Sequence, residues 1–134
     1  MDKTLLVPLD NTEVSEKMIR EADAWAAHLG SRVSFLHVIN PNYSWGEEKK
    51  PLFEERFEKA IHSCEVKSKY EVLFRVGKPY PKILEMEEEL NPLMILMAAH
   101  DHIVLERLFL GSNTDHILNH GHTSVIVYKG LSEE

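Results

Sequence analysis

The sequence predicts one α/β domain over residues 1–134, a doubly wound parallel sheet of five strands with helices on both faces. Short runs rich in β-branched and apolar residues alternate with longer segments of helical period along the whole chain. This alternation favours a parallel sheet, because right-handed crossovers place the helices on both faces. The length of 134 residues suits a single hydrophobic core.

The first half of the chain predicts two strands and two helices. Residues 3–9 (KTLLVPL) form the first strand, and the segment 11–13 (NTE) supplies cap-type residues for a helix that Gly30 ends. Residues 32–39 (RVSFLHVI) form the second strand, and residues 40–51 have the Pro, Asn and Gly content of a loop. The apolar stripe of the next helix is Leu52, Phe53, Phe57, Ala60 and Ile61, with Arg56 among them.

The second half continues the alternation. Residues 70–76 (YEVLFRV) form the third strand, and a helix with Pro81 in its first turn follows until Asn91-Pro92 breaks it. Residues 93–97 (LMILM) form the fourth strand, a last helix runs from about residue 113 to 119, and residues 124–129 (SVIVYK) form the fifth. The apolar face of the third helix is Ile83, Leu84, Met86 and Leu90, whereas Glu87, Glu88 and Glu89 are interpreted as a solvated face.

Composition excludes several classes of function. No apolar run approaches the roughly 18–20 residues of a membrane span, and the start of the chain lacks the pattern of a signal peptide, so we expect a cytoplasmic protein without a membrane partner. Cys64 is the only cysteine, which agrees with a reducing compartment. The net charge of −7 repels a phosphate backbone, so we expect no nucleic-acid partner.

Four segments resemble the universal stress protein family. VPLDNTEVSEKMI, FLHVI, VGKPYPKILEMEEE and the ending from GSNTDHIL to VIVYK occur in the order and spacing of that family. The resemblance implies a fold like that of the adenine nucleotide alpha hydrolases, with strand order 3-2-1-4-5. It also implies a homodimer paired through the fifth strand, Val125 to Tyr128, and in one branch a bound ATP.

The phosphate loop departs from the nucleotide-binding branch. That branch has Gly-x-x-Gly, nine residues, and then Gly-Ser or Gly-Thr, whereas Ala98 and Asp101 stand here at the two leading glycines and only Gly111-Ser112 matches. Ala98 adds a Cβ where backbone amides approach phosphate, and Asp101 adds a negative charge. At about 4 Å this charge repels a phosphate charge by on the order of 4 kcal/mol at an effective dielectric near 20. A Mg2+ ion held between Asp101 and the phosphates reverses that sign.

Other positions favour a nucleotide but have a second interpretation. Asp10 matches the family's acidic residue near the adenosine, and it is equally a helix cap. Val38 matches the position whose backbone meets adenine. Ser112 begins a helix N-terminus that favours an anion, although serine and threonine are also plain caps there. The candidate nucleotide-binding residues are Asp10, Val38, Met97, Ala98, Asp101, Gly111, Ser112, Asn113 and Thr114.

The histidines offer a weaker site. Paired imidazoles one helical turn apart can reach one zinc ion, but no cysteine ligand or HExxH motif accompanies them, so we expect no dedicated metal site. The weak candidates for metal ligands are His100, His102, His116 and His120, whereas His28, His37 and His62 are interpreted as structural.

No catalytic constellation emerges from the sequence. No serine lies in a Gly-x-Ser-x-Gly elbow, and His62 faces away from Cys64 on a helix. We therefore expect a stress-response protein that acts by binding an adenine nucleotide, ATP or AMP, and by homodimerisation. A regulatory protein of the same fold that binds an unknown protein partner and no nucleotide is the alternative, and a weak ATPase is the third reading.

Overall fold

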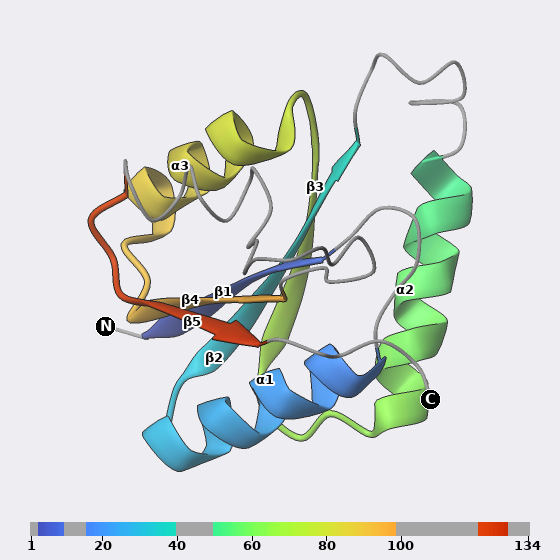
Figure 1. The fold of residues 1–134 in the computed structure, drawn as a ribbon. Coiled ribbons are helices and arrows are strands. Elements are labelled where there is room, and N and C mark those ends of the chain that lie inside the picture. Colours follow the sequence, from blue (N-terminus) through green and yellow to red (C-terminus); the bar gives the residue numbers. More distant parts are fainter. Residues whose placement is uncertain (1–2, 10–15, 40–49, 99–120, 129–134) are drawn as a thin grey trace, which may run out of the picture.

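The computed structural model describes residues 3–9, 16–39, 50–98 and 121–128. Within these ranges the chain forms a five-stranded sheet with the order β3-β2-β1-β4-β5, and every pair of neighbouring strands is parallel (Figure 1). This confirms both the fold class and the strand order expected above. The elements are β1 (Thr4–Leu9), α1 (Glu16–Leu29), β2 (Arg32–Ile39), α2 (Lys50–Cys64), β3 (Tyr70–Val76), α3 (Pro79–Leu90), β4 (Met94–Ala98) and β5 (Val125–Tyr128).

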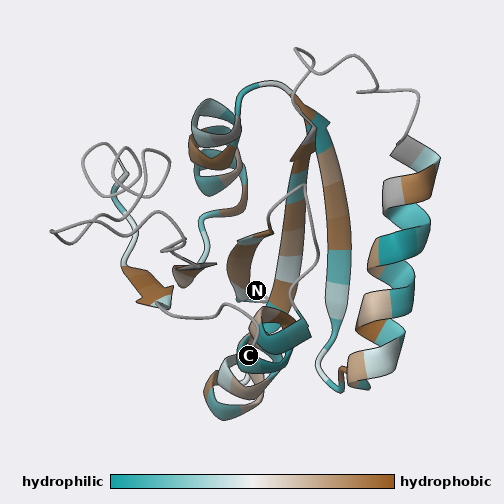
Figure 2. Cartoon of the chain, turned by 45° about the vertical axis from the view of Figure 1, so that its right-hand side comes forward, coloured by the Kyte–Doolittle hydropathy of each residue, from teal (hydrophilic) through white to brown (hydrophobic). Residues whose placement is uncertain are grey.

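The helices cover both faces of the sheet, as Figure 1 shows, with α1 and α2 on one face and α3 on the other. Side chains alternate between the two faces along each strand, so β1 contributes Leu5 and Val7 to the core under α1 and α2, and Leu6 to the core under α3. Figure 2 shows the resulting concentration of hydrophobic residues on the strands. None of the described helices is long and apolar enough to cross a membrane.

The helix ends follow the sequence signals. Gly30, directly after α1, has φ +66°, a conformation that glycine adopts without steric cost. Asn91 ends α3 in the left-handed conformation, and its backbone N–H donates to the carbonyl of Glu87 at 2.9 Å. Both terminations lie at the positions predicted from the sequence.

Two expectations about helix faces are wrong. Leu52, in the first turn of α2, is 47% exposed, whereas Phe57, Ala60 and Ile61 further along the helix are buried. The apolar period gives the direction of a helical face but not how far the sheet beneath it extends. Glu87 is only 2% exposed rather than solvated, and its surroundings are described below.

Candidate functional site

The carboxyl ends of the central strands define the expected ligand site. From β1 the chain builds outward to β2 and β3 on one side and to β4 and β5 on the other, so the strand order reverses between β1 and β4. Ligands of open α/β sheets bind outside the carboxyl ends of the strands at such a reversal. The described residues nearest this point are Leu9, the last residue of β1, and Ala98, the last residue of β4.

Val38 presents its backbone, not its side chain, at this edge. The side chain belongs to the buried cluster on the α3 face, and the residue is only 6% exposed. Arg32 N–H donates to the Lys3 carbonyl at 2.8 Å, so the peptide groups of Arg32 point toward β1. Every second residue of a strand directs its N–H and C=O groups to the same side, and the peptide groups of Val38 therefore also point toward β1. The β1 ladder ends at Leu9, opposite His37. The Val38 carbonyl therefore points past the end of β1, and β1 provides no ladder partner for it.

Met97 and Ala98 lie at the same edge of the sheet. Met97 is 5% exposed and packs in the α3-side cluster with Val38, so its side chain fills the floor beneath the site. Ala98 is level with Tyr128 of β5. Ala98, which the sequence analysis left outside the fourth strand, is the last residue of β4. The role of Met97 and Ala98 in ligand binding stays a prediction.

The remaining candidates lie outside the described residues. These are Asp10, Asp101, Gly111, Ser112, Asn113 and Thr114 of the nucleotide site, and His100, His102, His116 and His120 of the weak metal site. Within the described ranges, no group of three or more His, Cys, Asp or Glu side chains is placed to hold a metal ion.

The described histidines have structural surroundings. His37 is fully buried on the α2 face, with its ring centroid 4.9 Å from that of Phe57 and 5.7 Å from that of Phe74. His28 and His62 are exposed in the last turns of α1 and α2. His37 is thus part of the core, whereas a structural role of His28 and His62 stays a prediction.

Cys64 does not have the surroundings of an activated nucleophile. Its Sγ lies 3.6 Å from the Glu16 carbonyl, to which the thiol donates. Burial is the largest cause and raises the pKa of the thiol; the charge of Arg20 lowers that pKa, and the charges of Glu16 and Asp23 raise it. The thiol therefore stays protonated at neutral pH, unlike the low-pKa thiolates of reactive cysteines.

Glu87 is the charged residue that the sequence analysis placed wrongly. Its Oε2 accepts hydrogen bonds from the backbone N–H of His122 at 3.0 Å and of Thr123 at 2.7 Å. Burial alone raises the pKa of Glu87, but the hydrogen bonds from Thr123 and His122 outweigh it and lower that pKa. The carboxylate thus joins α3 to the segment before β5, at the amino end of the sheet, away from the nucleotide edge. In the sequence, the only signal for the burial of Glu87 was its position four residues after Ile83, which the structure shows to be buried.

Comparison with known proteins identifies similarity over nearly the whole chain. The model of the universal stress protein family matches residues 1–129. A universal stress protein of Methanocaldococcus jannaschii is 24% identical over 155 residues, covering 96% of each chain.

Solved structures share the fold. A universal stress protein solved in complex with cAMP superposes with a TM-score of 0.72 at 16% identity, covering 98% of both chains. The universal stress protein of Archaeoglobus fulgidus in complex with dAMP gives a TM-score of 0.71 at 15% identity, over 95% of this chain and 97% of the other.

Proposed function

The chain belongs to the universal stress protein family, and we propose that it acts in the cytoplasm by binding an adenine nucleotide at the carboxyl edge of its sheet. The observation that carries this proposal is the Val38 carbonyl, which points past the end of β1 at the reversal of strand order. A backbone acceptor held by a rigid central strand suits the exocyclic amino group of adenine. Two structural neighbours were solved with adenine mononucleotides, cAMP and dAMP, which supports the same class of ligand here.

The phosphate end of the site favours a ligand with few phosphates. Ala98 and Asp101 replace the two leading glycines of the family's phosphate loop, and at the position that the resemblance implies, Asp101 would add a negative charge near the anion. Repulsion grows with the number of phosphate charges near the carboxylate. We therefore propose that AMP binds more tightly than ATP when no divalent ion is present.

Titration calorimetry of the full chain with AMP and ATP tests both statements. We expect AMP to bind and ATP to bind more weakly in the presence of a chelator. The double variant Ala98→Gly, Asp101→Gly should tighten ATP binding more than AMP binding, because it removes bulk and charge at the phosphate loop. If neither nucleotide binds either protein, the alternative reading of a regulatory protein that binds no nucleotide replaces this proposal.

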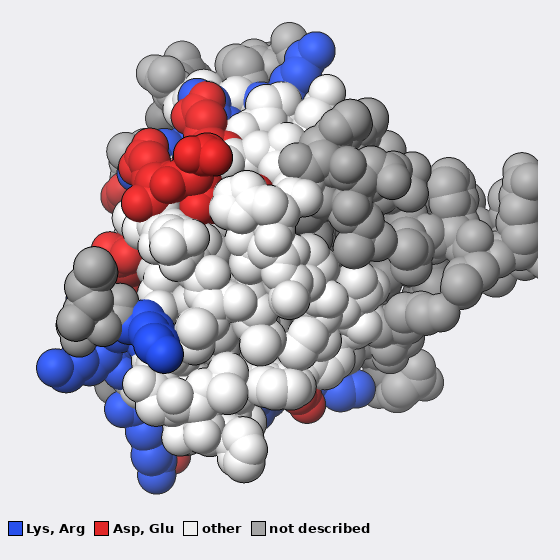
Figure 3. Space-filling view, turned by 90° about the vertical axis from the view of Figure 1, so that its left-hand side faces the viewer, with Lys and Arg blue, Asp and Glu red and all other residues white. Residues whose placement is uncertain are grey.

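We also propose a homodimer joined through the outer edge of β5, which pairs with β4 alone among the described strands. Val125 to Tyr128 carry no charge or proline, and all four residues are half-buried. Figure 3 shows one side of the molecule, with Asp and Glu side chains gathered in one area, Lys and Arg side chains mostly in another, and a broad uncharged area beside them. An uncharged edge strand is a template for pairing, and a two-fold axis closes the assembly at two copies.

The ladder geometry provides a sharp test of this dimer. Ile95 N–H donates to the Ser124 carbonyl at 2.9 Å, so the alternation turns the peptide groups of Val125 and Val127 toward the free edge. Val127→Pro removes an outward N–H and leaves the β4 ladder intact. Light scattering with gel filtration should give twice 15.5 kDa for the wild type and for the control Val127→Ala, but 15.5 kDa for Val127→Pro. A monomeric wild type at tens of micromolar overturns the proposed interface.

A further inference from the structure

The other edge of the sheet, β3, is also open. Among the described strands β3 pairs with β2 alone, and none of its seven residues is buried. Val33 N–H donates to the Lys69 carbonyl at 2.9 Å, so the parallel alternation directs the peptide groups of Tyr70, Val72 and Phe74 toward the free edge. Outward peptide groups at a strand edge are of the kind that another extended chain can pair with.

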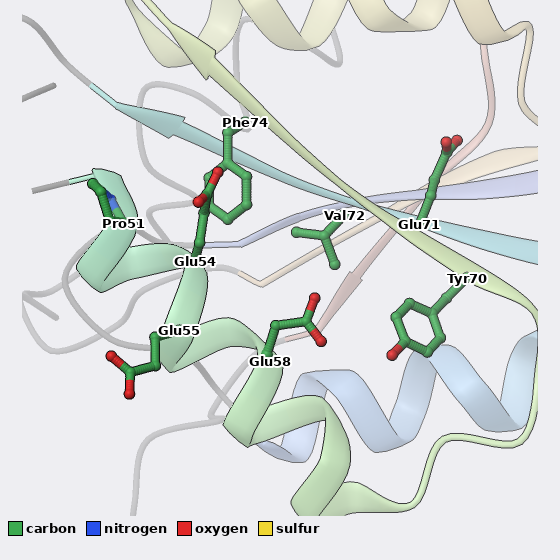
Figure 4. A pocket seen from close by; sticks show the side chains of 8 residues that line it. All are labelled: Pro51, Glu54, Glu55, Glu58, Tyr70, Glu71, Val72 and Phe74. Atoms are coloured by element: carbon green, nitrogen blue, oxygen red, sulfur yellow. The ribbon is translucent and has the colours of Figure 1, made fainter.

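A groove of about 620 Å³ runs along this edge between β3 and α2. Figure 4 shows its composition: Tyr70, Val72 and Phe74 point from β3 toward the helix, and the carboxylates of Glu54 and Glu58 point from α2 toward the strand. The groove therefore combines an apolar floor, a wall of negative charge and a row of backbone groups. Each of these three features can contact one part of an extended peptide.

The charges around the groove determine which kind of segment can bind in it. Lys59 lies beside Glu55, with Nζ 3.7 Å from Oε2, and Glu55 points away from the strand in Figure 4. Glu71 lies on the opposite face of β3, where its Oε2 accepts from the Ser34 hydroxyl at 2.8 Å. Glu54 and Glu58 point toward the strand in Figure 4, and Glu55 and Glu71 complete the acidic lining of the groove. A second copy of this chain would bring the same glutamates to its own β3 edge, and like charges oppose such pairing.

Arg75 limits how much of the edge is available. Its Nη1 donates to the Phe74 carbonyl at 2.9 Å and so covers the upper end of the row. The carbonyls of Tyr70 and Val72 and the N–H groups of Val72 and Phe74 are left toward the groove. This suits a short segment rather than a long strand.

We propose that the β3 edge and the facing carboxylates of α2 form a docking groove for a short, extended, basic segment of a partner protein, which adds to the sheet as a sixth strand. Main-chain hydrogen bonds to β3 hold the segment, apolar side chains cover Val72 and Phe74, and Lys or Arg side chains reach Glu54 and Glu58. This surface is separate from the carboxyl edge, so the inference does not depend on nucleotide binding.

A labelled peptide tests the groove directly. The probe is an acetylated and amidated heptapeptide of alternating Lys and Val, titrated with the full chain by fluorescence anisotropy. The double variant Glu54→Gln, Glu58→Gln should weaken binding about tenfold, the effect of two partly exposed charge contacts. The matched control Glu88→Gln, Glu89→Gln removes the same charge from the exposed side of α3 and should leave the affinity unchanged. Equal weakening by both pairs would show diffuse charge attraction and overturn the proposal.

Backbone pairing has its own test, which needs no change in β3. Two further peptides carry N-methyl groups on all valine nitrogens or on all lysine nitrogens, so that each keeps the charge but loses the donors along one edge. At least one of them should lose binding, and the amide protons of Val72 and Phe74 should exchange more slowly when the unmodified peptide is bound. Unchanged binding of both methylated peptides, or unchanged exchange at both amides, would show that no strand is added.

Discussion

Replacing Glu87 with alanine should destabilise the protein more than any other single removal of a carboxylate on α3. The side chain is 2% exposed and accepts the backbone N–H groups of His122 and Thr123. Hydrogen bonds to a charged acceptor contribute about 1.5–3 kcal/mol each, but water reaches part of the exposed amides once the carboxylate is gone. We therefore expect the free energy of unfolding to fall by about 2–3 kcal/mol, and the melting temperature by about 10 °C for a chain of this size.

Urea unfolding at pH 7, with Glu88→Ala as the control, measures this effect. Glu88 lies one residue further along α3 and its side chain is 79% exposed, with Oε2 3.7 Å from the His122 Nε2. Exposed pairs of this kind contribute about 0–1 kcal/mol, so Glu88→Ala should cost less than 1 kcal/mol. Equal losses for the two variants would refute the assignment of Glu87 as the carboxylate that holds the segment before β5.

The pH dependence of stability gives an independent check. The folded pKa of Glu87 is lowered below its ordinary value of 4.5, so its contribution is present above that value and is lost as the pH falls through the folded pKa. Glu87→Gln removes the titration while keeping the shape. The difference in unfolding free energy between wild type and Glu87→Gln should therefore shrink as the pH is lowered from 6 to 3. A difference that stays constant over this range would contradict an ionised Glu87 in the folded protein.

Three further outcomes follow from other contacts. Asp23→Ala removes the acceptor for the backbone N–H groups of Lys67 and Ser68, at 3.2 and 3.0 Å, and should cost about 1–2 kcal/mol by urea unfolding. Trp25→Phe removes the indole N–H that donates to the Tyr128 hydroxyl and should cost about 1 kcal/mol, with strong non-additivity in the double variant with Tyr128→Phe. Magnesium should raise ATP affinity more than AMP affinity in calorimetry, because the ion neutralises the charge near the triphosphate, and equal effects would argue against it.

The strands were predictable because each is a short run rich in apolar or β-branched residues. The predicted range 32–39 is β2 as observed, and 70–76 is β3, while the other three strands differ by one residue at one or both ends. These runs alone did not distinguish an edge strand from a central strand of the sheet. β1 and β3 both have apolar runs, yet β1 is almost wholly buried and β3 is not. The difference comes from strand order, which the family resemblance supplied and which no periodicity contains.

In the candidate site, the sequence predicted only positions that depend on the backbone and not on a side chain. The position of Val38 follows from its place at the end of a central strand, whatever its side chain. The role of Glu87 depends on a segment 35 residues further along the chain, whose amides need an acceptor at the amino end of the sheet. A charged residue near the boundary of a helical face has the same local pattern whether such a segment lies opposite it or not. A local sequence pattern therefore cannot predict which side chain accepts hydrogen bonds from backbone N–H groups far along the chain.

The two edges of the sheet differ in the partner strand that each favours, although the same topology creates both. β5 is four residues long and uncharged, and the hydrogen bond between Trp25 and Tyr128 joins it to α1, which suits the self-pairing proposed above. β3 carries the charged residues Glu71 and Arg75, its Phe74 carbonyl is covered by Arg75, and the glutamates of α2 lie beside it. Such an edge disfavours its own copy and favours a chain of opposite charge. If pairing of β5 uses one edge for assembly, β3 is the edge left for a different partner, and a dimer would present two such grooves at its far ends.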